Sequence, residues 1–596
     1  MTAPSTDAPG YAGLGLYVGD LHNHCGISYG HGSIEDAYAN ARLQLDFASV
    51  TGHGWWPDLP ERTPELASLV DYHTEGFARL ARLWDHVQDV TAAAHEDGRF
   101  VTFQSFEWHS LAHGDHCVYF DGPRGEIIRA ADLDELRARL RVLAAQGVRT
   151  WALPHHIGYG PARRGIDWAS YTEEFAPVVE MMSMHGCAES DEAPRSYLHT
   201  MGPRAGAATA VHGLRLGHRF GLIGSTDHHS AFPGSHGHGR VAVWAPELTR
   251  DGIWNAVQQR RTYAITGDRI LLATSVNGAP MGAEAASADR RRIHVTVQGR
   301  DALDHVELLR NGVPVHRVSR PELLSGAGGS DAFSGTLGFA VGWGRRGEPV
   351  HWDVVLRIEG GRLLDVQPRL RGPETVAPAE AEPDTYRPSW WERTGPGEIR
   401  LRTVTDGNPN TATDSTQGFS LRIEGDTSTR LVAVVNGVES AHAVGELLAG
   451  ARTGFTGGFV SGAYRFDRAV PDRETTAEFE LTDERPGGDG DFYHVRVRQL
   501  NDQWAWSSPT WVGPADSCSR AGFPPAGATR PAHPAPRPPP PEGEQTSTPT
   551  PPPTPARSHP PLRPVRPVPP VRRPYSRTPG PSLGEHARRS PPEHAP

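Results

Sequence analysis

Two short motifs in the N-terminal half of the chain pair polar side chains at a spacing suited to metal binding. One residue separates His22 from His24, and one separates Asp227 from His229. Along an extended strand, residues i and i+2 point to the same side, so each pair could direct two ligand atoms at one ion. Imidazole nitrogens combined with carboxylate oxygens suit Zn, Mn or Fe. The alternative for either pair taken alone is a surface loop.

Further candidate ligands lie next to segments predicted to be strands. They are His53, Glu107, His116, His155 and His156. Glu107 could bridge two ions, because a carboxylate offers two ligand oxygens. Each histidine alone would more often be a hydrogen-bonded structural residue, so the prediction depends on the agreement of several separate segments. His185 ends another predicted strand, and we expect it to orient a ligand or to touch substrate. Cys25 and Cys117 should pack behind the site, because adjacent strand residues point oppositely.

The elements that must position these residues alternate between strand-like and helix-like over residues 12–275. Such alternation over roughly 250 residues favours an α/β barrel, in which strand ends converge on one site. Residues 276–372 and 391–515 alternate apolar and polar residues and include an Asn-Gly turn, which predicts one or two β-sandwich-like units, with domain boundaries drawn at these residues. Residues 373–390 are expected to be a linker or excursion.

The two ends of the chain are predicted to be disordered. Residues 1–11 contain few large apolar side chains, and residues 516–596 are rich in proline. Such segments cannot bury enough apolar surface to fold. The proline-rich tail could dock onto a proline-recognising module.

Composition excludes several function classes. The 59 basic residues against 70 acidic ones leave a net charge of −11, which argues against nucleic-acid binding through a basic surface. All 59 are arginines, so mechanisms that need a Schiff-base or phosphate-loop lysine are excluded. The four scattered cysteines suit a reducing compartment, and the sequence shows no secretory signal and no apolar run of ~18 residues. We therefore expect a cytoplasmic protein without a membrane partner.

The ordered motifs of the sequence resemble those of a known superfamily. The ordered phrases DLHNH, TGH, SFEWH, GDHCVYF, PHH and STDHH are similar to those of the PHP (polymerase and histidinol phosphatase) superfamily, over about residues 12–270. The phrases GDLHNH…SYGHGS and RRTYAITGDRI look like an uncharacterised bacterial branch in which β-rich sequence follows the barrel. The resemblance implies a distorted (β/α)7 barrel that holds two or three divalent metal ions.

The resemblance also implies a ligand for each position. A first metal would be held by His22, His24, Glu107 and Asp227; a second by Glu107, His116 and His155 or His156; and a third by His53 and His229. Two positions depart from the superfamily pattern, since Gly52 and Tyr29 stand where acidic residues are expected. Two metals are therefore as compatible with the sequence as three.

These inferences favour a metal-dependent hydrolase, with phosphoester hydrolysis of a small molecule as the leading hypothesis. The catalytic candidates are Glu107, His185 and Asp227. Arginines that could contact a phosphate are Arg163, Arg164, Arg240 and Arg269. Two alternatives remain open: hydrolysis of a non-phosphate ester or amide, and a non-catalytic protein that binds metal or ligand.

Overall fold

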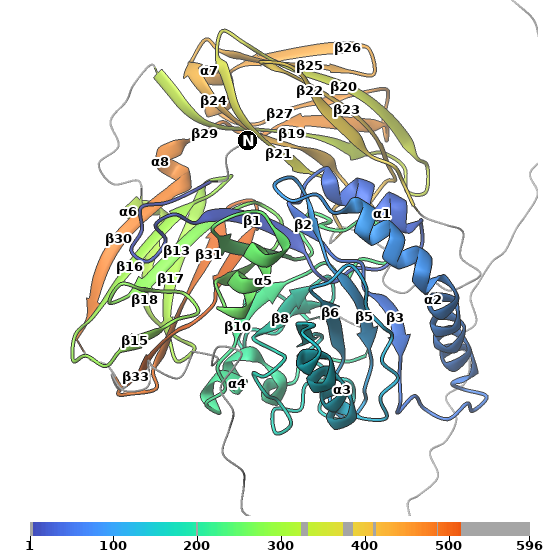
Figure 1. Cartoon of the computed structure of the whole chain (residues 1–596). Helices are drawn as coiled ribbons and strands as arrows, with labels where there is room; N and C mark the ends of the chain where they lie inside the picture. Colours follow the sequence, from blue (N-terminus) through green and yellow to red (C-terminus); the bar gives the residue numbers. More distant parts are fainter. Residues whose placement is uncertain are drawn as a thin grey trace, which may run out of the picture. The chain divides into compact units, whose positions relative to one another are not determined.

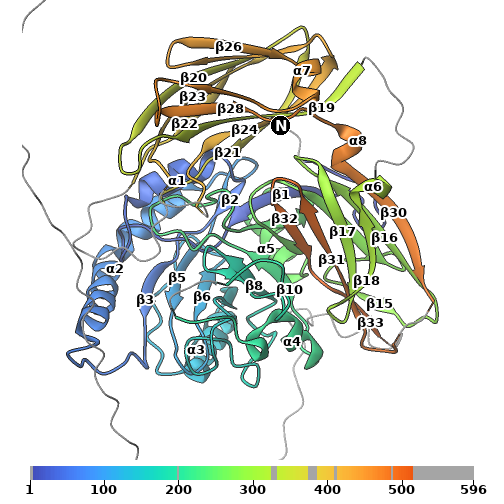
Figure 2. The same ribbon diagram turned by 180° about the vertical axis from the view of Figure 1, so that it is seen from behind.

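The computed structural model describes residues 4–197, 201–323, 332–373, 386–408, 413–484 and 487–513. The chain divides into two compact units, Met1–Phe523 and Pro524–Pro596, and all described residues belong to the first. The predicted disordered tail at 516–596 and most of the predicted linker at 373–390 lie outside the described residues. The described part is a mixed α/β structure rich in strands (Figures 1 and 2).

The N-terminal region, residues 15–265, alternates strands with helices as the sequence predicts. Its strands are β1 (Gly15–Asp20), β2 (Phe47–Ala48), β3 (Gly52–Trp55), β4 (Val101–Thr102), β5 (Gln104–Trp108), β6 (His116–Phe120), β7 (Thr150–Pro154), β8 (Val178–Ser183), β9 (Gly186–Cys187), β10 (Gly221–Gly224), β11 (Arg240–Ala245) and β12 (Thr262–Ile265). Its α-helices are α1 (Ile34–Arg42), α2 (Ala67–Ala94), α3 (Leu133–Ala145), α4 (Ala210–Arg215) and α5 (Arg250–Gln258).

The expected (β/α)7 barrel is not confirmed. The strands of the described N-terminal region are divided among three sheets, with the orders β12-β11-β1-β2-β4, β3-β5-β6-β7 and β10-β8-β9. The pairs β1–β2, β2–β4, β3–β5 and β8–β10 are parallel, whereas β5–β6, β6–β7 and β1–β11 are antiparallel. The ends of β1, β3, β5, β7, β8 and β10 still carry the candidate site residues or lie next to them.

Local sequence signals explain where two helices begin. Ser33 caps α1: its hydroxyl accepts the Asp36 N–H at 3.0 Å, and the Asp36 carboxylate accepts the Ser33 N–H in return. Asp132 caps α3 by accepting the Glu135 N–H at 2.9 Å. The helix then buries the four leucines that recur at helical spacing in the sequence: Leu133, Leu136, Leu140 and Leu143.

A first β unit is built from residues 271–319 and 476–513. Its strands are β13 (Leu271–Val276), β14 (Ala279–Pro280), β15 (Glu284–Ala286), β16 (Arg291–Gln298), β17 (Leu303–Arg310), β18 (Val313–Ser319), β30 (Thr476–Asp483), β31 (Phe492–Gln499), β32 (Trp504–Ser507) and β33 (Thr510–Gly513). β16 pairs with β30, β17 with β31, and β15 with β33. β32 also pairs with β12, so this unit extends a sheet of the N-terminal region.

An inserted β unit, residues 332–471, lies between the two halves of the first. Its strands are β19 (Ala332–Trp343), β20 (Val350–Glu359), β21 (Arg362–Arg369), β22 (Trp390–Gly395), β23 (Glu398–Thr405), β24 (Gln417–Asp426), β25 (Arg430–Val435), β26 (Val438–Ala443), β27 (Arg452–Phe455), β28 (Gly462–Phe466) and β29 (Val470–Pro471). Three short helices belong to or flank it: α6 (Arg320–Leu323), α7 (Val444–Leu448) and α8 (Asp472–Thr475). Two sheets enclose its own apolar core.

Strand pairing crosses the segment at 373–390 in both β units. In the inserted unit β20 pairs with β23 and β25, and β19 pairs with β24. The two β-rich stretches of sequence therefore share sheets, whereas the sequence analysis expects them to be successive domains.

The described part of the predicted disordered N-terminus is packed. The Tyr11 side chain is fully buried, its hydroxyl donates to the Thr274 carbonyl oxygen at 2.8 Å, and its ring meets the Trp244 ring edge-on. Ala8 is also buried, whereas most other residues of the segment 4–11 are exposed. Among the described residues, no helix is both long and apolar enough to cross a bilayer.

Candidate metal centre

The two paired motifs are brought together by hydrogen bonds between their loops. The Asp227 N–H donates to the His22 carbonyl oxygen and the His24 N–H to the His228 carbonyl oxygen, each at 2.7 Å. Asp20, at the end of β1, is fully buried and accepts the backbone N–H groups of Thr226 and Gly234. The loop after β1 is thus tied to the loop after β10, and the two pairs of ligand-type side chains meet.

Asp227 lies at the centre of this meeting point. Its Oδ1 atom is 3.0 Å from His24 Nε2 and 3.3 Å from His22 Nε2. Its Oδ2 atom is 2.7 Å from His185 Nε2 and 3.1 Å from His156 Nε2. One carboxylate therefore faces four imidazoles that come from three separate parts of the N-terminal region.

Glu107 occupies a similar position on β5. Strand register places it beside His53 of β3, and its Oε2 atom lies 2.6 Å from His53 Nδ1 and 3.6 Å from His24 Nε2. Its Oε1 atom lies 2.8 Å from His155 Nε2 and 3.3 Å from His109 Nδ1. The two oxygens thus face different sets of nitrogens, as a bridging carboxylate would.

His229 lies at the edge of the cluster. Its ring is 4.4 Å from the His24 ring between centroids, and its Nδ1 atom is 3.9 Å from Asp227 Oδ1. His24, His53 and His229 each place one ligand atom within 4.8 Å of the others. The Tyr29 ring stacks on the His53 ring at 3.5 Å between centroids, so Tyr29 packs an aromatic ring against the cluster.

His116 is placed differently from its neighbours on β6. Its Nδ1 atom bonds the Gly114 carbonyl oxygen at 2.9 Å, and its ring lies 6.0 Å from the Trp108 ring. Cys117 of β6, and Asp115 just before the strand, point toward the cluster instead. Asp115 groups with Glu107, His155 and His156 within ligand distance, and Cys117 Sγ lies 3.4 Å from His155 Nδ1. The expectation that Cys117 packs behind the site is therefore wrong, because β6 turns Cys117 toward the cluster and His116 away from it.

Other residues support the cluster from outside. Glu180 of β8 places its Oε2 atom 2.9 Å from His22 Nδ1, which leaves His22 Nε2 facing Asp227. Arg164 donates through Nε to Asp115 at 2.7 Å, and its NH2 nitrogen lies 3.0 Å from His109 Nδ1. The sequence analysis missed Glu180 and Asp115. Glu180 lies in the predicted strand that precedes His185, which was the available signal for it. The sequence offered no signal for Asp115, because alternation does not say whether Asp115 or His116 points inward.

Like Arg164, two more of the arginines considered as phosphate contacts have structural partners. Arg240 is fully buried and donates to the carbonyl oxygens of Gly234 and Gly267. Arg269 pairs with Asp46 at 2.9 Å. Both arginines join loops together at these positions.

The pKa shifts in the cluster agree with metal binding at some positions and oppose it at others. Burial by itself would raise the pKa of Glu107, but His109, His53 and His155 hold it well below its usual value, and the pKa of Asp227 is lowered in the same way. Burial lowers the pKa of His53 well below its ordinary value. Against the effect of burial, Asp227, Cys117 and Glu180 raise the pKa of His22 well above its ordinary value, and Cys117 and Glu107 raise that of His155 to about 10. Ionised carboxylates and neutral imidazoles are the protonation states that bind metal, so an ion would have to displace a proton from these two rings.

Several buried ligand atoms lack a well-aligned hydrogen bond. They are both carboxylate oxygens of Asp227, Glu107 Oε2, His24 Nδ1 and His53 Nε2. Buried polar atoms are nearly always hydrogen-bonded, so such a concentration needs an explanation, and a bound ion is one. The groups of ligand atoms that lie within 4.8 Å of one another include His22–His24–Asp227, His53–Glu107–His109 and Glu107–Asp115–His155–His156. This mixed nitrogen and oxygen set fits divalent Zn, Mn or Fe.

Comparisons with known proteins give limited information about function. Residues 235–279 match a family model described as a protein of unknown function, DUF3604. An uncharacterised protein of Chlamydia muridarum is 29% identical over 169 residues, and one of Chlamydia pneumoniae is 23% identical over 253 residues. These alignments cover 26% and 39% of this chain, and the chain spans only 27% and 40% of the two relatives.

One solved structure is also similar. It is a two-domain protein from Bacteroides vulgatus that contains a predicted PHP-like metal-dependent phosphoesterase. The similarity covers 81% of this chain and 99% of that one, at 11% identity and a TM-score of 0.27.

Proposed function

We propose that the chain is a metal-dependent hydrolase that cleaves a small-molecule phosphoester. The observation that carries the proposal is the position of Glu107, whose two buried oxygens face separate sets of imidazole nitrogens at 2.6 and 2.8 Å. A carboxylate between two nitrogen sets is suited to bridge two ions. The ordered histidine motifs of the sequence support the same reading.

The ligand groups share members, which limits how many ions the site could hold. His22, His24 and Asp227 would hold one ion, and Asp115, His155 and His156 a second. Glu107 would bridge the two, since its Oε2 atom faces His24 and its Oε1 atom faces His155. A third ion would need His53, with either His229 or His109, and would share His24 or Glu107 with the first two. Asp115 takes the place that the sequence analysis assigned to His116. We propose two ions, or three when His53 also takes part.

When bound, the ions would supply an activated water and neutralise charge on the phosphoryl oxygens. The chain's own residues supply the remaining functions. Asp227 and Glu107 hold the imidazoles in position, and Glu180 orients His22. His185 contacts Asp227 and also lines a neighbouring cavity, so its imidazole is placed to hold or deliver a proton to a leaving oxygen there.

A kinetic experiment with metal analysis tests the proposal. The purified protein, loaded with Mn or Zn, should release phosphate from p-nitrophenyl phosphate, and the Glu107→Gln variant should lose this activity by at least ~100-fold. Glu126→Gln is the matched control, since Glu126 pairs with Arg139 on the surface. Hydrolysis of p-nitrophenyl acetate without hydrolysis of any phosphoester would favour the non-phosphate alternative. Bound metal without any hydrolysis would favour a binding protein.

The sequence-based expectations about partners belong to this proposal. We propose a small-molecule substrate and a cytoplasmic location, with no nucleic-acid partner. The acidic net charge of −11 supports the last point.

A further inference from the structure

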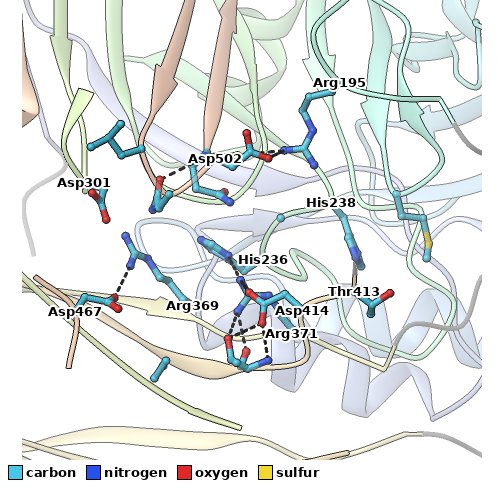
Figure 3. A pocket seen from close by; sticks show the side chains of 18 of the residues that line it. Arg195, His236, His238, Asp301, Arg369, Arg371, Thr413, Asp414, Asp467 and Asp502 are labelled. Carbon is cyan, nitrogen blue, oxygen red and sulfur yellow. Dashed lines mark hydrogen bonds and ion pairs between the residues drawn. The ribbon is translucent and has the colours of Figure 1, made fainter. Parts of the chain in front are cut away.

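A cavity of about 820 Å³ lies beside His185, which contacts Asp227 of the candidate metal centre. Figure 3 shows side chains that line this cavity. The N-terminal region contributes residues 182–186 at and after β8, residues 194–196 after β9, and the loop before β11, and the two β units contribute the remaining walls. His185 lines the cavity, and its Nε2 atom lies 2.7 Å from Asp227 Oδ2. A molecule in the cavity would therefore be one side chain away from the carboxylate at the centre of the cluster.

The walls carry charged side chains of both signs. They are Arg195, Arg369, Arg371, Arg465 and Arg468, with Asp301, Asp414, Asp467 and Asp502. Figure 3 shows Arg195 and Asp502 on one side of the cavity, and Arg371 and Asp414 on the other. Guanidinium groups only donate hydrogen bonds and carboxylates only accept them. A hydroxyl group does both, so walls that alternate the two suit a molecule with many hydroxyl groups.

Each of the five arginines in the lining is paired with a carboxylate. Arg195, Arg371 and Arg465 pair with Asp502, Asp414 and Asp467 of the lining, and Arg369 and Arg468 pair with Asp268 and Glu474 behind it. Arginine matches phosphate geometry, since its planar group can donate two parallel hydrogen bonds. A phosphate and a set of hydroxyl groups are the two features that the lining would recognise.

One buried carboxylate holds three of the walls in place. Asp268 is fully buried and accepts hydrogen bonds from Arg369 Nε at 2.8 Å, His236 Nε2 at 2.9 Å and Asn501 Nδ2 at 2.8 Å. Arg369 belongs to the inserted β unit, His236 to the N-terminal region, and Asn501 to the first β unit, and all three line the cavity. A cavity whose walls are fixed before binding loses less entropy when a ligand enters.

We propose that this cavity is a substrate chamber for a phosphorylated sugar or polyol, with the phosphate toward His185 and the hydroxyl groups on the arginine and aspartate walls. The inference rests on the proposed function, to which it adds the class of substrate. In the reaction a water oxygen bonds to phosphorus and the bond from phosphorus to the sugar oxygen breaks. The sugar oxygen takes a proton and leaves as an alcohol, and inorganic phosphate remains.

Steady-state kinetics of the full-length, metal-loaded protein test this inference. The substrates are a panel of hexose, pentose and glycerol phosphates, with p-nitrophenyl phosphate as the generic substrate. We expect kcat/KM for the best sugar or polyol phosphate to exceed that for p-nitrophenyl phosphate by at least ~10-fold. Arg465→Gln should raise KM for that substrate about fivefold, by removing a charged hydrogen-bond donor. Its effect on p-nitrophenyl phosphate should be less than about twofold.

The choice of variants separates the chamber from the metal centre. Arg465 pairs with Asp467, and its side chain is 44% exposed, so Gln should be tolerated there. Arg400→Gln is the control, since Arg400 also pairs with an aspartate of the inserted unit, Asp353, but does not belong to the cavity lining described above. Metal content should be the same in all three proteins.

The outcomes distinguish failure of the chamber from failure of the proposed function. One outcome is that p-nitrophenyl phosphate is hydrolysed but no panel member is preferred, or that Arg465→Gln behaves like Arg400→Gln. This outcome contradicts the proposed substrate chamber and leaves the proposed hydrolase activity supported. If no phosphoester is hydrolysed by the metal-loaded protein, the proposed function fails. Calorimetric titration with the same panel then tests whether the cavity binds these molecules. Binding of a sugar or polyol phosphate that is weakened by Arg465→Gln supports the proposed chamber, and absence of binding contradicts it.

Discussion

Replacing Glu180 with glutamine should weaken metal binding without changing any predicted ligand. Glu180 is 4% exposed and places Oε2 2.9 Å from His22 Nδ1. That contact leaves His22 Nε2 3.3 Å from Asp227 Oδ1 and 3.1 Å from His24 Nε2. A carboxylate partner fixes the orientation of a ligating imidazole and raises its basicity, and loss of such partners typically costs 10–100-fold in metal affinity. Glutamine keeps the shape and one acceptor oxygen but removes the charge.

The expected loss corresponds to about 1.4–2.7 kcal/mol of binding free energy, from about 1.36 kcal/mol per tenfold change. Competition with a chromogenic chelator for Zn measures it directly, in the wild type and in Glu180→Gln. Glu174→Gln is the matched control, because Glu174 pairs with Arg141 on the surface. If Glu180→Gln binds Zn within about twofold of the control, then either His22 is not a ligand or its orientation does not depend on Glu180, and the reasoning fails.

Three further predictions follow from the site and its surroundings. Asp115→Asn should reduce bound metal and phosphoester hydrolysis by at least ~10-fold, whereas His116→Gln should change them less than about threefold; equal losses would restore His116 as the ligand. Removing metal with a chelator should lower the melting temperature, because an ion that binds only the folded chain stabilises it; an unchanged melting temperature would argue against a resident ion. Burial would raise the pKa of Asp268, but Arg369 and His236 hold it well below its ordinary value. Asp268 should therefore stabilise the fold above its unfolded pKa of ~3.9 and lose that effect as pH falls through its lower folded value. The melting-temperature gap between wild type and Asp268→Asn should be widest near neutral pH and narrow in acid, and a gap independent of pH would refute this.

Spacing along the chain predicted much of what meets at the metal centre. The i, i+2 spacing singled out the His22–His24 and Asp227–His229 pairs, although both lie in loops after β1 and β10 and Asp227 has a positive φ, so strand alternation is not what aligns them. Glu107 and His155 follow from their places at strand ends. The structure brings these residues within a few ångströms of one another, as in the 2.8 Å distance from Glu107 Oε1 to His155 Nε2.

The orientation of β6 could not be read in the same way. His116 and Asp115 are adjacent, and alternation says only that they point oppositely, not which one points inward. That choice depends on the antiparallel register with β5, which sets Cys117 opposite Glu107. One residue of register reverses both faces of a strand.

The sequence by itself determined the residue types, their alternation and the caps of α1 and α3, because these depend on neighbours a few positions away. Only the tertiary structure decided which strands pair. β16 meets β30 and β17 meets β31 across more than 150 residues, and such partners are selected by fit between apolar faces that many strands share. The charged cavity beside His185 has the same origin. Its walls come from three parts of the chain, and no local pattern in any one of them specifies the other two.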